Sequence, residues 1–133
     1  MKQFLTETAV STGELVLGPA VDGFRYGTLK VTVAHRWGVP PDRTMLRFYL
    51  PTGLEPAGTA WPPVNTENGS IYLGVDPPPA GATTSHTFAF RRPATLAGGQ
   101  MDLDSWGLGM KATQLRESIP WNNTATVTIR TAG

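Results

Sequence analysis

The sequence contains no cysteine in its 133 residues. Disulfide bonds, thiolate metal sites and cysteine nucleophiles are therefore excluded. Histidine is scarce as well, with two residues, His35 and His86. Both take the inward parity of the strands predicted around them, and no further ligands stand at a matching spacing. We therefore expect structural roles for both histidines and no metal site.

Charged residues make up only 16% of the chain, below the roughly 25% of typical soluble domains. The formal net charge is +1, and both signs are scattered along the sequence. Without a basic stripe, the chain has no electrostatic footprint for nucleic acid and no polybasic anchor for a membrane surface. We therefore expect no nucleic-acid partner.

Long apolar runs are also missing. No stretch approaches the ~18 residues that a membrane-spanning helix needs, which predicts no membrane insertion by this segment. Near the start, Thr6, Glu7 and Thr8 interrupt the apolar region that a signal peptide requires. We expect any leader to lie outside this sequence.

What the sequence does contain is a period of two in its apolar residues. Four segments alternate in this way, and their inward sets are Leu29, Val31 and Val33; Leu46, Phe48 and Leu50; Phe88 and Phe90; and Ala125, Val127 and Ile129. Alternation places one face of each strand in a core and the other in water. Shorter apolar runs add strands at 14–17, 70–75 and 100–110.

Turn residues separate these runs, with 15 glycines and 12 prolines. Asn68-Gly69 is a strong hairpin signal because both residues tolerate positive φ. Asn122-Asn123 can hydrogen-bond its own backbone before the last strand. The pattern predicts one all-β domain over residues 13–133, an antiparallel sandwich of roughly seven to eight strands. Residues 1–12 are expected to form a flexible or edge-pairing tail.

Three segments resemble a known family. The first is a corner formed by Leu50, Pro51, Gly53 and Leu54, and the second is a turn at Ala80, Gly81 and Ala82. The third is a closing signature matched by Glu117, Pro120, Asn122, Asn123, Ala125 and Val127. Over about residues 27–131 these motifs resemble the bacterial cell-surface repeat called domain of unknown function 11. The resemblance implies an immunoglobulin-like β-sandwich, an extracellular or cell-surface location, and no catalytic residues.

Candidate catalytic and metal-binding groups are few. Asp102 and Asp104 lie two residues apart and therefore share one face of a predicted strand. Because calcium needs six to eight oxygen ligands, this pair alone does not make a calcium site, and we expect a solvated face. The chain has no Gly-x-Ser-x-Gly elbow and no phosphate-cradling glycine loop. We therefore predict no enzyme activity, no catalytic residue, no cofactor and no bound metal.

A lysine–asparagine crosslink is a sharper hypothesis, and it involves Lys30, Lys111, Asn122 and Asn123. This chemistry requires a buried lysine beside an acid. Lys30 has outward parity and Lys111 falls in a loop-like stretch, which weighs against the crosslink.

The four tryptophans, Trp37, Trp61, Trp106 and Trp121, all stand in or beside predicted turns. One interpretation is that they plug the ends of the sandwich. The other is an aromatic platform that binds a sugar or a protein, particularly at Trp37 beside Arg36.

These features favour a non-enzymatic structural or assembly module of a bacterial exported or cell-surface protein. Its partners would be other protein modules or copies of itself, with a glycan or a host protein as further candidates. Two alternatives stay open. One is an adhesin domain that binds carbohydrate or protein through its tryptophan-bearing loops. The other is a self-assembling filament or phage subunit, in which residues 1–12 supply a strand to a neighbour.

Overall fold

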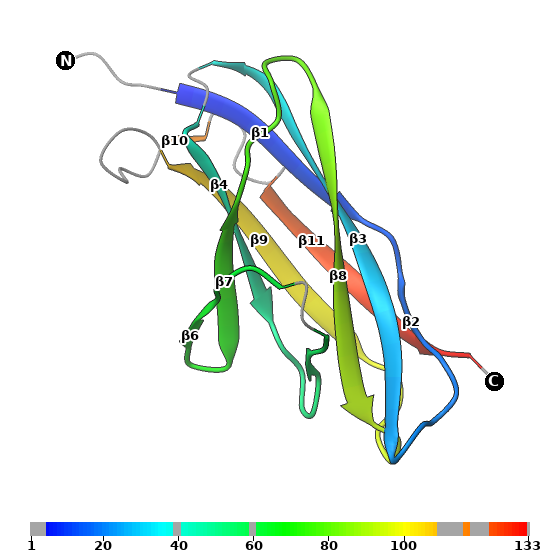
Figure 1. Cartoon of the computed structure of the whole chain (residues 1–133). Helices are drawn as coiled ribbons and strands as arrows, with labels where there is room; N and C mark the ends of the chain where they lie inside the picture. Colours follow the sequence, from blue (N-terminus) through cyan, green and yellow to red (C-terminus); the bar gives the residue numbers. More distant parts are fainter. Residues whose placement is uncertain (1–4, 39–40, 59–60, 109–115, 118–122, 133) are drawn as a thin grey trace.

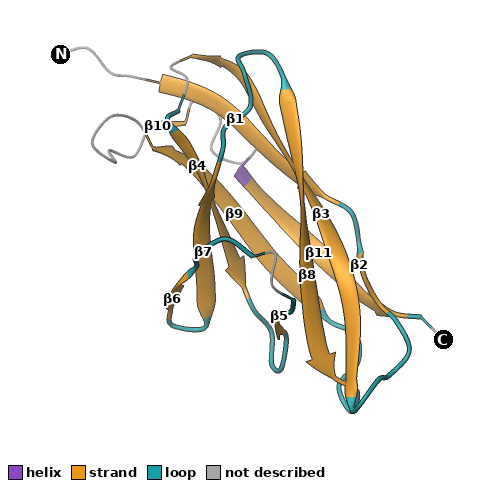
Figure 2. Cartoon of the chain, viewed as in Figure 1, coloured by secondary structure: helices purple, strands orange, loops and turns teal. Residues whose placement is uncertain are grey.

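The protein is an all-β sandwich of two sheets. The computed structural model describes residues 5–38, 41–58, 61–108, 116–117 and 123–132, without the side chains of residues 5–7, 37 and 116–117. One sheet has the strand order β10-β1-β3-β8-β5 and the other β2-β11-β9-β4-β7-β6. The two sheets form two layers of long strands (Figure 1), and strands make up most of the described chain (Figure 2).

The strands are β1 (Leu5–Thr12), β2 (Leu15–Leu17), β3 (Phe24–Gly38), β4 (Arg43–Tyr49), β5 (Glu55–Pro56), β6 (Asn65–Glu67), β7 (Ser70–Val75), β8 (Thr83–Pro93), β9 (Gln100–Leu108), β10 (Arg116–Glu117) and β11 (Thr124–Thr131). The longer ladders are antiparallel, as the alternation predicts. Two short ladders are parallel: β1 with β10, and β11 with β2. Among the described residues, no helix has the length and apolar character needed to span a membrane.

The core lies between the sheets and is built from the predicted inward residues. Leu29, Val31 and Val33 of β3 are fully buried and oppose Phe48 and the other inward side chains of the second sheet. Burial of one such apolar side chain stabilises the fold by about 1.5–3 kcal/mol. The predicted parity of β3, β4, β8 and β11 is therefore confirmed.

An aromatic cluster fills one end of this core. The ring of Phe48 packs edge-on against Phe88 at 5.2 Å and against Phe90 at 5.7 Å, measured between ring centroids. Edge-to-face pairs of this kind contribute about 0.5–1.5 kcal/mol beyond the area they bury.

Two turns follow the predicted chemistry. Asn68 and Gly69 both have positive φ, 46° and 82°, and close the hairpin between β6 and β7. In the Leu-Pro-x-Gly-Leu corner, the amide of Leu54 donates to the carbonyl of Pro51 at 3.1 Å while Gly53 has φ 79°. This positive φ strains any residue with a Cβ, and a Cβ on Gly53 would also stand 2.5 Å from Leu96 Cδ1, so the corner favours glycine.

Three short strands, β5, β6 and β10, go beyond the sequence prediction. Each has two or three residues, too few for a period to be read. Residues 5–12 form β1, which pairs with β3 of the same chain. The N-terminal segment crosses between the layers, because β1 belongs to the five-stranded sheet and β2 to the six-stranded sheet.

One buried cation also lies outside the sequence prediction. Arg92 continues the inward parity of β8 and is only 6% exposed. Its Nε donates to the carbonyl of Thr52 at 3.2 Å and its Nη1 to the carbonyl of Gly98 at 2.6 Å. These bonds compensate the burial of the charge and join the turn after β4 to the loop before β9.

Candidate functional site

The outer face of the six-stranded sheet carries a compact group of large side chains. Cross-strand register brings Arg47 of β4 opposite Tyr72 of β7 on one side and opposite Asp104 of β9 on the other. Tyr49 stands two residues along β4, and Trp106 two residues along β9, on the same face. We call these five residues, Arg47, Tyr49, Tyr72, Asp104 and Trp106, the Arg47 cluster.

The guanidinium of Arg47 is the centre of this cluster. Its Cζ lies 4.8 Å from the ring centroid of Trp106 and 5.9 Å from those of both Tyr49 and Tyr72. These distances are within the range of cation–π attraction, which contributes about 0.5–1 kcal/mol at exposed sites and more where water is excluded. The rings of Tyr72 and Trp106 also approach each other, with centroids 6.5 Å apart.

A chain of hydrogen bonds fixes the cluster. Arg47 Nη1 donates to Tyr49 Oη at 3.2 Å, and Tyr49 Oη donates to Asp104 Oδ2 at 2.9 Å. The hydrogen bond to Tyr49 is the main cause that raises the pKa of Arg47 above its ordinary value, while burial opposes it and the charge of Asp104 adds to it. Arg47 is therefore a permanent cation held in one orientation.

The cluster remains accessible at its edge. Tyr49 is 41% exposed, although most large apolar side chains of the described chain are buried. Thr124 and Thr126 of β11 lie exposed beside Asp104 and Asp102 and form a small polar border. A half-buried arginine with three aromatic rings, bordered on one side by small polar residues, has the composition of protein-interface hot spots.

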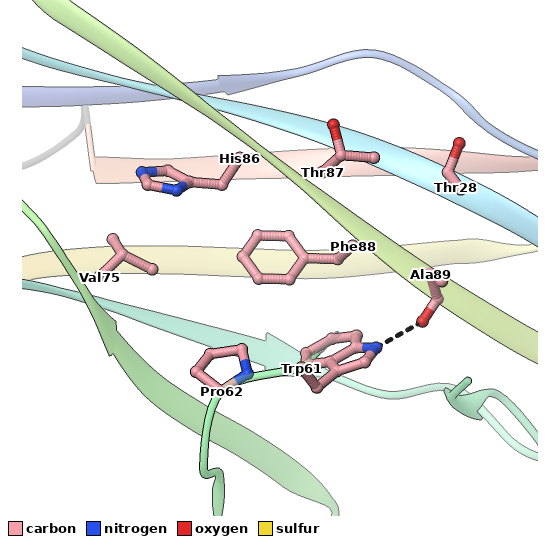
Figure 3. Close-up of a pocket in the computed structure, with 8 residues that line it drawn as sticks. All are labelled: Thr28, Trp61, Pro62, Val75, His86, Thr87, Phe88 and Ala89. Carbon is pink, nitrogen blue, oxygen red and sulfur yellow. Dashed lines mark hydrogen bonds between the residues drawn. The ribbon is translucent and has the colours of Figure 1, made fainter. Parts of the chain in front are cut away.

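A second feature is a pocket beside β8. It has a volume of about 370 Å³ and is lined by Thr28, Trp61, Pro62, Val75, His86, Thr87, Phe88 and Ala89. Figure 3 shows Phe88 between Trp61 on one side and His86 and Val75 on the other. The lining is mainly apolar.

Trp61 closes the core at this pocket. Its ring packs against Phe88 at 5.0 Å and Phe90 at 5.2 Å between centroids. Its Nε1 donates to the carbonyl of Ala89 at 2.8 Å, drawn as the dashed line in Figure 3. Trp61 therefore packs against the core, which is a structural role.

The two histidines occupy different environments. His35 is fully buried, and neither ring nitrogen has a hydrogen-bond partner in the described chain. His86 lines the pocket, and Thr84 Oγ1 lies 3.4 Å from its Nε2. Burial lowers the pKa of His86, and the charge of Asp76 partly opposes this. No group of three or more metal-ligating side chains occurs within the described ranges.

The predicted aspartate pair lies on one face, as expected. Asp102 accepts a hydrogen bond from Thr126 Oγ1 at 3.2 Å, and Asp104 accepts one from Tyr49. Sequence parity therefore places both carboxylates correctly, but their partners come from neighbouring strands and follow only from register.

The residues of the crosslink hypothesis are not brought together where they are described. Lys30 is exposed on the outer face of β3, as its parity predicts. Asn123 is buried and its Nδ2 donates to the carbonyl of Ser105 at 3.0 Å. Lys111 and Asn122 lie outside the described residues.

Trp106 corrects one expectation. The sequence predicts that it stands in or beside a turn, but it lies within β9 on the outer face of the sheet, against Arg47. Trp121 and the side chain of Trp37 lie outside the described part.

The sequence places Arg47 and Tyr49 on an outward face. Their meeting with Tyr72 and Trp106 depends on the β7-β4-β9 order, which no local pattern reveals.

No family model matches the chain, and no curated protein matches it. Solved structures do match. A non-cellulosomal cohesin from the hyperthermophilic archaeon Archaeoglobus fulgidus superposes with a TM-score of 0.57 at 13% identity, covering 96% of this chain and 92% of that one. A CARDB domain from Pyrococcus furiosus, solved in complex with di-metal ions, gives 0.51 at 17% identity, covering 99% and 94%.

Identities this low carry the fold and nothing more. The fold predicted from the sequence is confirmed, whereas the particular repeat family that its motifs resemble is not matched. The chain is an immunoglobulin-like β-sandwich of a kind found in prokaryotic proteins.

Proposed function

We propose that this domain is a non-enzymatic assembly module of a bacterial exported or cell-surface protein, related to the domain of unknown function 11 repeat, and that it binds another protein through the Arg47 cluster. The observation that carries the proposal is the cluster itself. One arginine and three aromatic rings converge on the outer face of the six-stranded sheet, where they do not contribute to the core.

The physical basis is the low entropic cost of binding through a rigid surface. The aromatic side chains have few rotatable bonds, and Arg47 is already held by Tyr49. A partner that covers Tyr72 and Trp106 removes apolar ring area from water without having to order these side chains. The fixed positive charge favours a partner that presents a carboxylate or a carbonyl oxygen at the centre of the contact.

The role of the carboxylates supports a non-enzymatic function. Asp102 and Asp104 both accept hydrogen bonds from neighbouring strands, which assigns them to the stability of the face. The fold likeness to a cohesin and a CARDB domain is compatible with a module that forms one part of a larger protein.

The other functions are less well supported by the geometry. Trp61 is engaged with the core, and the ring of Trp106 is covered on one face by Arg47, so neither offers an open stacking platform for a sugar. Strand β1 pairs with β3 of its own chain along one edge, so donating β1 to a neighbour would break this ladder.

The test is a comparison of variants on the two outer faces. The immobilised domain is exposed to extracts and culture medium of the producing bacterium, and bound proteins are quantified by mass spectrometry. We expect the amount of a captured protein to be at least about tenfold lower for Arg47→Ala and for Trp106→Ala than for the wild type. Lys30→Ala, on the opposite sheet, serves as the matched control and should bind like the wild type.

Equal capture by all four proteins would refute the proposal, provided that thermal melts show the variants to be folded. A glycan array and size-exclusion chromatography complete the test. Glycan binding that depends on Trp106 would favour the adhesin function, and concentration-dependent oligomers would favour the self-assembling subunit.

A further inference from the structure

Strand β8 has one edge that is largely uncovered. Along its whole length it pairs with β3, from Ala34↔Thr83 to Phe24↔Pro93. On the opposite edge, β5 pairs only at Glu55↔Arg91 and Pro56↔Phe90, and the amide of Ala57 donates to the carbonyl of Ala89. Within the described residues, no strand covers this edge from Thr83 to Phe88.

The alternation of an antiparallel ladder identifies the uncovered groups. Each residue directs its N–H and C=O to the same side, and successive residues alternate. The carbonyl of Ala89 points toward β5, because it accepts from Ala57. Thr83, Ser85 and Thr87 share this parity, so their backbone donors and acceptors face the open side.

The pocket of Figure 3 lies directly against this edge. Thr87, Phe88 and Ala89 belong both to the edge and to the pocket lining. Trp61, Pro62 and Val75 form its apolar remainder, and the volume is about 370 Å³. Backbone groups that have no strand partner within the described ranges therefore lie beside an apolar pocket.

We propose that this edge binds an extended peptide segment of another protein, which adds to the five-stranded sheet beside Thr83–Thr87 and places an apolar side chain in the pocket. Outward-facing amides and carbonyls that repeat every second residue, roughly 6.8 Å apart, match the spacing of another extended backbone. Main-chain hydrogen bonds supply affinity, and the pocket selects the side chain. This site is independent of the Arg47 cluster, which lies on the other sheet.

The chemistry favours another protein over a second copy of this chain. If two β8 edges paired around Ser85, the incoming strand would place Thr84 opposite His86 and Ala82 opposite Phe88. The polar Thr84 and the small Ala82 do not fill a lining of Trp61, Val75 and Phe88. An alternating peptide with valine or leucine on its inward face does.

The edge also lacks the devices that usually prevent such pairing. Thr83, Ser85 and Thr87 carry no charge and no proline, and the ladder between β3 and β8 continues without a register shift. Natural sheets protect long exposed edges with lysine, proline or bulges. An uncovered edge without them is suited to receive a strand.

The probe is an acetylated and amidated peptide, Thr-Val-Thr-Leu-Thr-Val-Thr, titrated into the isotope-labelled domain. We expect saturable shifts of the amide signals of Thr83, Ser85 and Thr87, and slower hydrogen exchange at these amides. A peptide methylated on alternate backbone nitrogens cannot donate to the edge and should bind at least about tenfold more weakly. A peptide with serine in place of leucine should also bind more weakly, because it leaves the pocket unfilled.

Ser85→Pro provides the matched change in the protein. The amide of Ser85 faces the open edge, so proline removes one donor to the peptide without removing a bond to β3. We expect this variant to lose peptide binding while it retains its fold. If it does not fold, the methylated peptide still tests the proposal on the wild-type protein.

Three results would overturn the proposal. The first is equal binding of the methylated and unmethylated peptides, or no binding of either. The second is protection of the Thr83, Ser85 and Thr87 amides in the free monomer, which would show the edge to be covered already. The third is concentration-dependent dimerisation that protects the same amides, which would make the occupant a second copy of the chain.

Discussion

The outer faces of the two sheets follow the same alternation but differ in what they can contact. On the five-stranded sheet, the central cross-strand neighbours of β3 and β8 are mostly small and hydroxylated: Thr32 Oγ1 lies 3.0 Å from Ser85 Oγ, and Lys30 stands opposite Thr87. Toward one end of this face, Arg91 lies 4.4 Å from the ring centroid of Phe24 and pairs with Glu55. On the six-stranded sheet, the equivalent positions bring Arg47 against Tyr72 and Trp106. Parity decides that a residue faces water, and its size and its cross-strand neighbours decide whether the face becomes a contact surface.

The largest expected effect separates the inner face of a strand from its outer face. Phe48 and Tyr49 are adjacent on β4, but Phe48 is fully buried and Tyr49 is 41% exposed. Phe48→Asp should unfold the domain because it buries an unpaired charge, and the same holds for charges at Val31, Phe88 or Val127. Tyr49→Asp should leave a cooperative fold. Thermal melts followed by circular dichroism measure both, and a wild-type melting temperature for Phe48→Asp would contradict the strand parity.

The second effect compares the two outer faces directly. Arg47→Ala removes three cation–π contacts and a hydrogen bond, so we expect a loss of about 1–2 kcal/mol in the free energy of unfolding. Lys30→Ala, at an exposed position, should change it by less than about 0.5 kcal/mol. Chemical denaturation measures both values. Equal losses would show that the Arg47 cluster adds nothing to a solvated face.

A smaller effect is expected for the hydroxyl pair of the five-stranded sheet. Thr32→Val removes the exposed contact with Ser85 while it keeps a β-branched side chain suited to a strand. The free energy of unfolding should stay within about 0.5 kcal/mol of the wild type. A larger loss in the same denaturation experiment would mean that this face is more tightly coupled than its composition indicates.

The smallest effect is a dependence on pH at the pocket. Burial lowers the pKa of His86 below its ordinary value of 6.5, so the unfolded chain binds a proton more readily than the folded chain. The stabilising contribution of the neutral ring is therefore present above pH 6.5 and decreases as the pH falls below it. Melting temperatures measured across this range should decline less steeply for His86→Gln. Identical slopes for the two proteins would contradict this role.

Alternation alone predicts the core, because inward parity at Val31, Phe48, Phe88 and Val127 needs no knowledge of the partner strands. It does not predict contacts that depend on strand order. Trp106 illustrates this limit: its position near the end of an apolar run suggests a turn, whereas its ring is part of a sheet face only because β9 pairs with β4.

Buried polar groups are the other kind of feature that the sequence conceals. Arg92 has inward parity, which would ordinarily count against a strand assignment. Its acceptors are the carbonyls of Thr52 and Gly98, which the fold brings to it. The open edge of β8 is hidden for a similar reason, since it results from the brevity of β5.

The parallel pairing of β2 with β11 has a mechanical consequence. Leu15, Val16 and Leu17 run beside Ile129, Arg130 and Thr131 in the same direction. The chain enters at one end of the sandwich and leaves at the other (Figure 1). A tension applied through the end of β11 therefore pulls β11 along β2 and loads all of their hydrogen bonds together, whereas at the other end of the chain the force first meets the ladder between β1 and β3. In a chain of such modules, the short ladder between β2 and β11 would resist the force that enters through β11.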